Sequence, residues 1–265
     1  MPYATSSDDA QIHYEVHGSG DPVLLIMGLG SNAYGWYRTI PWLSTRYEVI
    51  AFDNRGTGRS DVPAGAYSIA QMAADAAAVL DAAGRDRVHV VGASLGGMIA
   101  QRVTLAYPQQ VRSLVLICTT PGGPHAARAS DDVLNAMVQG GEDPSTIYRR
   151  NAWFLYGADT RTNHPERIEE DLVYRGKIPT SPAGYFGQLQ AAMSHDTWDE
   201  LSSISSPTLV VHGDADLLVP TDNGRLLAQR IPGAELVLVP GAGHMLQSDG
   251  GDAVRDAVLG FLARG

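Results

Sequence analysis

The stretch from Val88 to Ala100, VHVVGASLGGMIA, constrains the fold of this chain more than any other part of the sequence. An apolar, β-branched run stops at the segment GASLG, and an apolar pattern of helical spacing begins directly after it. This predicts a strand, a tight turn and a helix, with Ser94 at the turn. Glycines two residues before and after the serine suit such a turn, because the backbone there leaves no room for a Cβ atom. The positive N-terminal end of the following helix would point at this turn and stabilise negative charge that develops there during a reaction. Ser94 is therefore a candidate nucleophile.

Strand and helix patterns alternate along most of the chain. A hairpin pattern covers residues 3–17, and apolar runs of strand length follow at residues 22–27, 47–53, 88–93 and 111–119. Helical patterns separate these runs: one carries Trp36, Tyr37 and Trp42, and another spans about 68–83 before Gly84. The alternation resumes at residues 207–212, 222–231, 235–239 and 252–263. The sequence therefore predicts an α/β fold with a mostly parallel, doubly wound sheet.

Residues 122–206 interrupt this alternation. They contain helical patterns at about 133–138, 146–155, 165–174 and 185–193, without a convincing strand. We expect a core domain of residues 1–121 and 207–265, with residues 122–206 inserted as a helical cap. Its short helices need apolar contacts with the core, because helices of this length are marginal alone. The cap aromatics either fill its core or line a substrate pocket; the pocket candidates are Trp153, Phe154, Tyr185 and Phe186.

Two later segments supply partners for a nucleophilic serine. Asp216 lies just past the strand predicted at 207–212, and His244 follows the strand predicted at 235–239. Parallel strands bring their C-terminal ends to one edge of the sheet, so these side chains should converge on Ser94. A histidine can take the proton of a serine, and a carboxylate can orient that histidine. Asp214 is the alternative acid, since it lies in the same turn.

The order Ser94, Asp216, His244 resembles the α/β-hydrolase superfamily, and more narrowly its cofactor-free esterase, enol-lactonase and perhydrolase-like branch. Residues 27–30, MGLG, are similar to that family's His-Gly oxyanion loop, with methionine in place of the histidine. Residues 53–60, DNRGTGRS, resemble a structural loop of the family. The resemblance implies that the backbone amides of Leu29 and Leu95 receive the oxyanion.

The resemblance also implies a serine hydrolase that cleaves carboxylic esters or lactones through an acyl-serine intermediate. Three alternatives stay open: a C–C bond hydrolase, a cofactor-free perhydrolase, and a small-ligand receptor with little turnover. The first two would use the same three side chains. The expected partner is a small-molecule ester or lactone, whose identity the sequence leaves open together with the oligomeric state.

Composition excludes other classes of function. The net charge is −10 without long single-sign runs, which disfavours nucleic acid and membranes as partners. No apolar run approaches the roughly 18 residues of a membrane span, and the N-terminal segment lacks signal-peptide features. The single cysteine, Cys118, excludes an intrachain disulfide and favours a reducing compartment, so we expect a cytoplasmic protein. Metal-ligand spacing and the third glycine of a dinucleotide fingerprint are missing, so no metal and no cofactor are expected.

Overall fold

A single twisted sheet organises the chain. The computed structural model describes residues 2–139 and 143–264, and the statements below refer to those ranges. The strands are β1 (Tyr3–Thr5), β2 (Gln11–His17), β3 (Asp21–Ile26), β4 (Tyr47–Phe52), β5 (Val88–Ala93), β6 (Val111–Ile117), β7 (Thr208–Gly213) and β8 (Glu235–Val239). They pair in the order β1-β2-β4-β3-β5-β6-β7-β8. All neighbours from β4 to β8 are parallel, whereas β2 pairs antiparallel with both β1 and β4.

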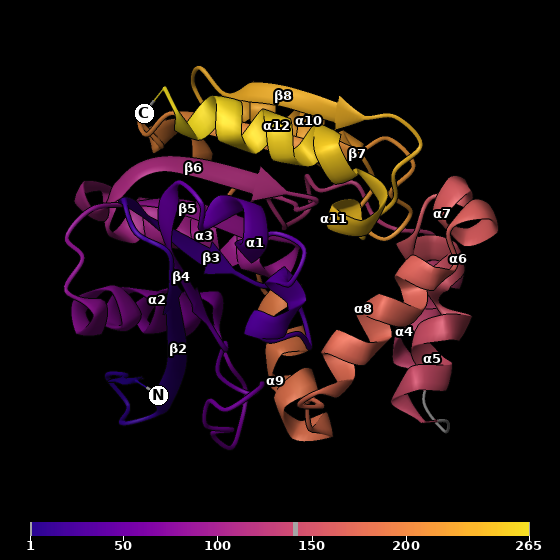
Figure 1. The fold of residues 1–265 in the computed structure, drawn as a ribbon, viewed down its shortest axis with the longest axis horizontal. Helices are drawn as coiled ribbons and strands as arrows, with labels where there is room; N and C mark the ends of the chain where they lie inside the picture. Colours follow the sequence, from indigo (N-terminus) through magenta and orange to yellow (C-terminus); the bar gives the residue numbers. More distant parts are fainter. Residues whose placement is uncertain (1, 140–142, 265) are drawn as a thin grey trace.

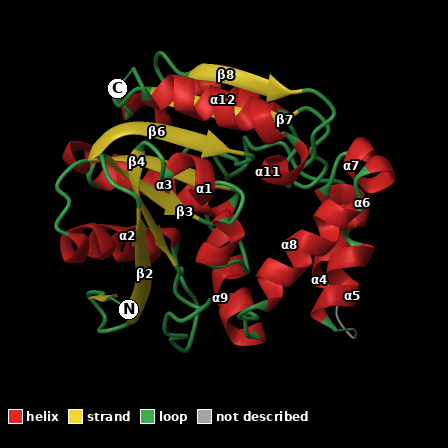
Figure 2. Ribbon diagram, viewed as in Figure 1, coloured by secondary structure: helices red, strands yellow, loops and turns green. Residues whose placement is uncertain are grey.

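Helices cover both faces of the sheet (Figures 1 and 2). These helices are α1 (Ile40–Leu43), α2 (Ile69–Ala83), α3 (Leu95–Ala106), α10 (Asp222–Arg230), α11 (Leu246–Asp249) and α12 (Gly251–Leu262). Short 3-10 turns, η1 (Ala33–Trp36), η2 (Pro108–Gln110) and η3 (Leu201–Ser203), lie in the connections. The sheet is therefore doubly wound, as the sequence predicts.

The strands divide their buried side chains between two apolar clusters. Leu24 and Ile26 of β3 belong to the cluster that holds α2, α3 and α10, whereas Val23 and Leu25 belong to the cluster with α1 and α12. Successive side chains of a strand point to opposite faces, so a strand with both faces covered must be apolar throughout. This explains why β3 from Pro22 onward, and β5 apart from the buried His89, are apolar rather than alternating.

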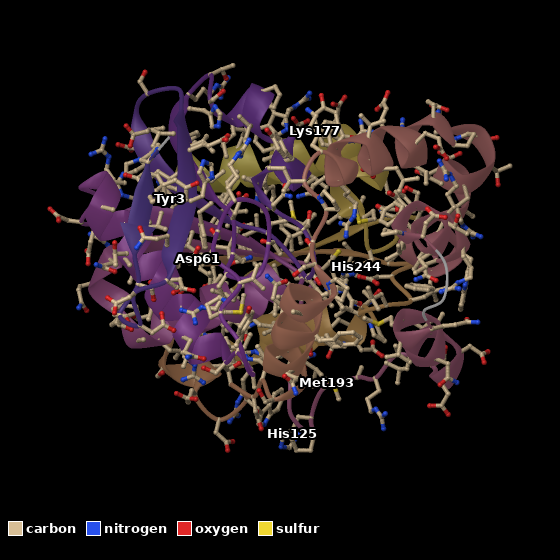
Figure 3. The ribbon with its side chains drawn as sticks, turned by 90° about the horizontal axis from the view of Figure 1, so that it is seen from below. Tyr3, Asp61, His125, Lys177, Met193 and His244 are labelled. Atoms are coloured by element: carbon tan, nitrogen blue, oxygen red, sulfur yellow. The ribbon has the colours of Figure 1, made fainter. Side chains whose placement is uncertain are left out.

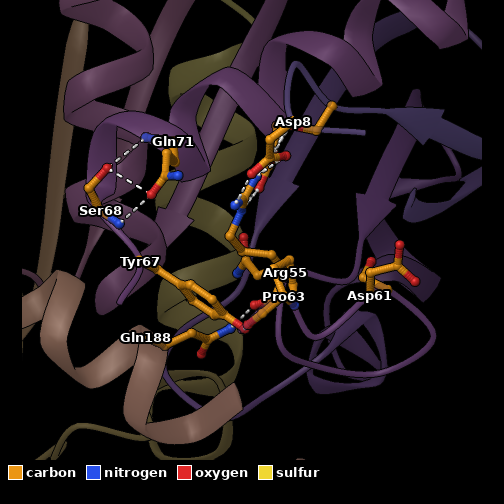
Figure 4. Close-up of polar contacts among 12 residues, drawn as sticks. Asp8, Arg55, Asp61, Pro63, Tyr67, Ser68, Gln71 and Gln188 are labelled. Carbon is orange, nitrogen blue, oxygen red and sulfur yellow. Dashed lines mark hydrogen bonds and ion pairs between the residues drawn. The ribbon is translucent and has the colours of Figure 1, made fainter. Parts of the chain in front are cut away.

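Local signals account for the ends of α2. Ser68 accepts a hydrogen bond from the Gln71 amide, and the Gln71 side chain accepts one from the Ser68 amide (Figure 4). This capping box satisfies amides that the first helical turn leaves without partners. Gly84 adopts a left-handed conformation with φ of 67° and ends the helix.

The aromatic segment before β4 differs from the expectation. It forms η1 and the short helix α1 rather than a single helix carrying Trp36, Tyr37 and Trp42. Pro41 lies in the first turn of α1, where its missing N–H is tolerated, but it cannot continue a helix from η1. Trp36 is fully buried beneath the sheet, so burial rather than helical periodicity explains its position.

Helices also fill the segment between β6 and β7. They are α4 (Asp131–Val138), α5 (Pro144–Arg150), α6 (Ala152–Leu155), α7 (Ala158–Asn163), α8 (Glu166–Gly176) and α9 (Pro182–Met193), called the inserted helices below. The pattern at 146–155 forms two helices that meet at Asn151, and α7 has no counterpart among the predicted patterns. In Figure 1 the arrowheads of β6 and β8 point toward the inserted helices. Within the described ranges, no helix is long and apolar enough to cross a membrane.

Candidate active site

The turn between β5 and α3 holds Ser94 in a strained conformation. Its φ is 55° and its ψ is −120°, a combination that a residue with a side chain rarely adopts. A Cβ atom on Gly92 would lie 2.2 Å from the Gly96 carbonyl oxygen, and one on Gly96 would lie 2.0 Å from the Ile26 carbonyl oxygen. Both glycines are therefore required by close backbone approach. The strain is held by hydrogen bonds on the Ser94 amide and carbonyl, the latter from the Thr119 hydroxyl at 2.7 Å.

The structure brings together the three side chains that the sequence singles out. The His244 Nε2 atom lies 3.0 Å from the Ser94 hydroxyl oxygen. On the other side of the ring, Nδ1 lies 2.8 Å from Oδ2 of Asp216. Ser94 and His244 are 150 residues apart in sequence. They meet because β5 and β8 deliver their following loops to the same edge of the sheet.

Asp216 is buried, yet its environment favours the carboxylate form. Burial alone would raise the pKa of Asp216, but the charge of His244 and hydrogen bonds from His212 and His244 lower that pKa well below its usual range. The amides of Leu218 and Val219 donate to its Oδ1 atom, each at 2.9 Å. Both carboxylate oxygens are thus engaged, which fixes the direction from which Oδ2 meets the imidazole.

Asp214, the alternative acid, has another partner. Its Oδ1 atom accepts a hydrogen bond from the Gly241 amide at 2.6 Å, and its side chain is exposed. Asp214 thus ties the loop after β7 to the loop after β8. The carboxylate beside the imidazole is that of Asp216.

A second carboxylate, Asp249, supports the loop that carries His244. Its Oδ2 atom accepts hydrogen bonds from the amides of Gly243, at 2.7 Å, and Gly157, at 2.8 Å. The Met245 amide donates to the Leu155 carbonyl, so α6 also contacts this loop. Figure 3 shows His244 between the sheet and the inserted helices. The sequence does not single out Asp249, because it lies outside the predicted patterns and its partner Gly157 is 92 residues away.

The loop after β3 lies against the Ser94 side chain. A Cβ atom on Gly28 would be 3.1 Å from the Ser94 Cβ and 3.6 Å from its hydroxyl oxygen. Among the hydrogen bonds of the described residues, neither the Leu29 amide nor the Leu95 amide has a protein acceptor. Backbone amides without protein acceptors, in the loop beside Ser94 and at the residue after it, are candidate oxyanion donors.

The loop of residues 53–60 supports its neighbours rather than the reacting groups. The Asp53 carboxylate accepts hydrogen bonds from the Ala33 amide at 2.8 Å and the Arg59 amide at 2.9 Å. Asn54 donates to the Met27 carbonyl at 2.9 Å. The loop of residues 53–60 therefore holds residues 27–33 in place through these hydrogen bonds.

The four aromatics proposed for the pocket lie in different environments. Phe154 is only 2% exposed, whereas Trp153 is 39% and Phe186 is 55% exposed. The Tyr185 ring lies close to Gly30, since a Cβ atom there would be 2.9 Å from its Cδ2 atom. Of the four, only Tyr185 has a contact with the loop of residues 27–30 among those described for the structure.

One cluster behind Asp216 has the residue types of a metal site. Ligand atoms of Cys118, His212 and Asp216 lie within 4.8 Å of one another, and all three residues are buried. Burial raises the pKa of the Cys118 thiol well above its usual value. The His212 Nε2 atom also lies 2.8 Å from the Val219 carbonyl oxygen, so these groups are occupied within the fold.

Comparisons with known proteins agree with this architecture. A model of the family described as alpha/beta hydrolase fold matches residues 21–251. A protein of Azorhizobium caulinodans named "Putative carbamate hydrolase RutD" is 33% identical over 98% of both chains. Two solved structures also align with this chain. The first is an esterase from Thermogutta terrifontis, with 27% identity and a TM-score of 0.85; the alignment covers 99% of this chain and 98% of the esterase chain. Est816, described as an N-acyl homoserine lactone degrading enzyme, has 31% identity and a TM-score of 0.81, covering 98% of this chain and 100% of its own. The chain belongs to the α/β-hydrolase fold family, and it is a hydrolase.

Proposed function

We propose that this hydrolase cleaves carboxylic esters or lactones through an acyl-enzyme intermediate on Ser94. The observation that carries the proposal is the continuous hydrogen-bonded line from the Ser94 hydroxyl through His244 to Asp216, with contacts of 3.0 and 2.8 Å. This arrangement suits a serine nucleophile with a histidine base and an orienting carboxylate.

In the first half-reaction, the Ser94 oxygen attacks the substrate carbonyl carbon while His244 Nε2 takes the hydroxyl proton. The carbonyl electron pair moves to oxygen, and the Leu29 and Leu95 amides stabilise the resulting oxyanion. When the tetrahedral intermediate collapses, the bond to the leaving oxygen breaks and His244 protonates that oxygen. The products of this half-reaction are an alcohol and the acyl-Ser94 ester; a lactone would keep its alcohol attached to the acyl group.

The second half-reaction repeats these steps with water. His244 takes one proton from the water as its oxygen attacks the acyl carbon, and the Ser94 oxygen then leaves with that proton. The carboxylate of Asp216 stabilises the imidazolium in both halves and holds Nδ1 protonated. The chemistry requires no cofactor. We assign the inserted helices the role of a cap that excludes water and shapes the acyl pocket.

A carbamate is the second candidate substrate class. The observation favouring it is the name of the Azorhizobium caulinodans relative, which aligns over nearly the whole of both chains. A carbamate carbonyl presents the same electrophilic carbon to Ser94, so the three side chains and the two amides would take the same roles.

A panel of substrates tests the proposal. Wild-type protein and Ser94→Ala are assayed with a short-chain nitrophenyl ester, an N-acyl homoserine lactone and an aryl carbamate. We expect multiple turnovers of the ester or the lactone by wild type alone. A higher kcat/KM for the carbamate would favour the second candidate. Wild-type rates no greater than those of Ser94→Ala on all three would contradict the proposal and favour a receptor that binds without turnover.

A further inference from the structure

Helix α9 and the residues just before it form hydrogen bonds with the loop that carries the Leu29 amide. The Gly30 amide donates to Oε1 of Gln188 at 2.9 Å, and the Thr180 hydroxyl donates to the Gly30 carbonyl at 3.0 Å. Asn32 adds a third bond, since its side chain donates to the Ile178 carbonyl at 3.0 Å. Both polar groups of the residue after Leu29 are therefore held by side chains from the inserted segment.

Gln188 has only one arrangement that satisfies both ends of its amide. Its Nε2 atom donates to the Arg55 carbonyl at 2.8 Å, while its Oε1 atom faces the Gly30 amide. Figure 4 shows Gln188 beside Arg55. The side chain is fully buried, so a flipped amide would leave two donors facing each other without water to relieve them. Gln188 thus acts as a rigid spacer between Gly30 and Arg55.

The backbone around Gln188 is closely packed. A Cβ atom on Gly184 would lie 1.9 Å from the Gly56 carbonyl oxygen, which places the first turn of α9 against the loop that contains Arg55. Arg55 is itself anchored by the buried carboxylate of Asp75, with contacts of 2.6 and 2.7 Å. Gln188 is therefore hydrogen-bonded to a residue, Arg55, whose side chain is anchored by Asp75.

Met27 gives the loop no polar support of its own. Its side chain points toward Gly35, where a Cβ atom would lie 2.7 Å from the Met27 Cε atom. A thioether is a weak acceptor and donates no hydrogen bond. The loop is held instead by Asn54, which donates to the Met27 carbonyl, and at its other end by Gln188 and Thr180.

We propose that Gln188 is a positioning residue that sets the Leu29 amide toward the oxyanion, so that the inserted helices contribute to kcat as well as to substrate binding. Gln188 holds the peptide that follows Leu29, and the orientation of that peptide limits the rotation of the Leu29 backbone. Donors aimed at the oxyanion act only in the transition state, so their loss lowers kcat more than it raises KM.

The inference rests on the proposed function, and the test separates the two. Gln188→Leu removes both hydrogen bonds at similar volume, and Thr180→Val removes the bond to the Gly30 carbonyl. Gln188→Glu keeps an acceptor for the Gly30 amide but loses the donor to the Arg55 carbonyl, so it separates the effects of the two hydrogen bonds. Tyr37→Phe is the matched control, because it removes another hydrogen bond to an inserted helix, from Tyr37 to Asp171.

For each variant, kcat and KM on a nitrophenyl ester, the rate of Ser94 phosphonylation by a fluorophosphonate, and Tm are measured. We expect Gln188→Leu to lower kcat and the phosphonylation rate about 10-fold or more, with KM within about 3-fold. Gln188→Glu and Thr180→Val should lose less, and Tyr37→Phe should lower Tm without changing kcat.

Two outcomes would overturn the inference. The first is an unchanged kcat and phosphonylation rate in Gln188→Leu at a reduced Tm, which would make Gln188 a packing residue only. If Gln188→Leu does not fold, an unchanged kcat in Thr180→Val, which removes the other hydrogen bond that holds Gly30, overturns the inference instead. The second is a wild-type Ser94 that does not react with the fluorophosphonate, which would remove the proposed function and this inference with it.

Discussion

At the scale of single residues, Asp216 is the carboxylate that orients the His244 imidazole. Its carboxylate meets His244 through Oδ2 and two backbone amides through Oδ1, so the charge is matched by hydrogen bonds in a buried place. A buried charge without such partners would be costly. The amides of Leu218 and Val219 therefore hold the Asp216 carboxylate in place beside the histidine.

Substituting each aspartate of this turn gives a matched pair. We expect Asp216→Asn to lower kcat on the order of 10³-fold or more, because an amide permits the wrong imidazole tautomer and cannot stabilise the imidazolium. Asp214→Asn keeps an oxygen acceptor for the Gly241 amide and should stay within about 3-fold of wild type. Steady-state kinetics on a nitrophenyl ester checks both. A severe loss in Asp214→Asn with a mild one in Asp216→Asn would reverse the assignment.

At the scale of elements, the unit of strand β5, the Ser94 turn and helix α3 sets the position of Ser94, the proposed nucleophile. The turn is crowded on two sides, by the Gly96 carbonyl near Gly92 and by the end of β3 near Gly96. A side chain at either glycine would push helix α3 away from the sheet.

Two glycine substitutions test this crowding. Gly96→Ala would place its Cβ atom 2.0 Å from the Ile26 carbonyl oxygen, and we expect it to destabilise the fold by at least about 2 kcal/mol and to abolish activity. Gly260→Ala is the control, because it lies in helix α12 and its Cβ atom would meet nothing within 4 Å. Alanine should stabilise that helix by up to about 1 kcal/mol. Urea unfolding of both variants measures the difference; equal stabilities would contradict the account.

The inserted helices give a second prediction at this scale. Phe154 is buried, so Phe154→Ala should lower the free energy of unfolding by about 3–5 kcal/mol without changing acyl chain-length preference. Tyr185 contacts the Gly30 region, so Tyr185→Ala should change that preference or kcat. Trp153→Ala, at an exposed side chain, should leave both properties near wild type. The check is a series of nitrophenyl esters assayed beside urea unfolding. Unaltered selectivity in Tyr185→Ala would place the pocket wall elsewhere.

The features that neighbouring residues encode can be predicted from the sequence, whereas those that depend on distant residues cannot. The β5 run, the paired glycines and the Ser68 cap are encoded by neighbouring residues, so the fold class and Ser94 follow from the sequence. The choice between Asp214 and Asp216 depends on which carboxylate the turn buries. The sequence does not single out Gln188, because its hydrogen-bond partner Gly30 lies 158 residues away. An aromatic pattern also cannot separate Phe154, in a core, from the exposed Phe186, since both suit an amphipathic helix.

At the scale of the whole molecule, buried histidines link stability to pH. Burial, with a contribution from Arg112, lowers the pKa of His89 to about 4, and burial with Arg102 lowers that of His195 to about 4. In the unfolded chain these groups titrate near 6.5. Between these values the unfolded chain binds more protons, so stability is fully present above about pH 6.5 and is lost as pH falls toward 4.

We therefore expect the free energy of unfolding in urea to fall steadily from pH 7 to pH 4.5. His89→Gln removes one titrating group and should flatten this dependence. A stability that is constant or rises over the same range would show that these histidines do not resist protonation in the fold.

We propose that Ser94 is the nucleophile and His244 its base. Intact-mass measurement after treatment with a fluorophosphonate tests it most directly, because the serine oxygen displaces fluoride from phosphorus and the adduct remains bound. We predict one adduct per chain, mapped to the peptide that contains Ser94. Ser94→Ala should give none, and His244→Ala should react on the order of 10³-fold more slowly than wild type. An adduct on another residue, or equal labelling of wild type and Ser94→Ala, would contradict the account.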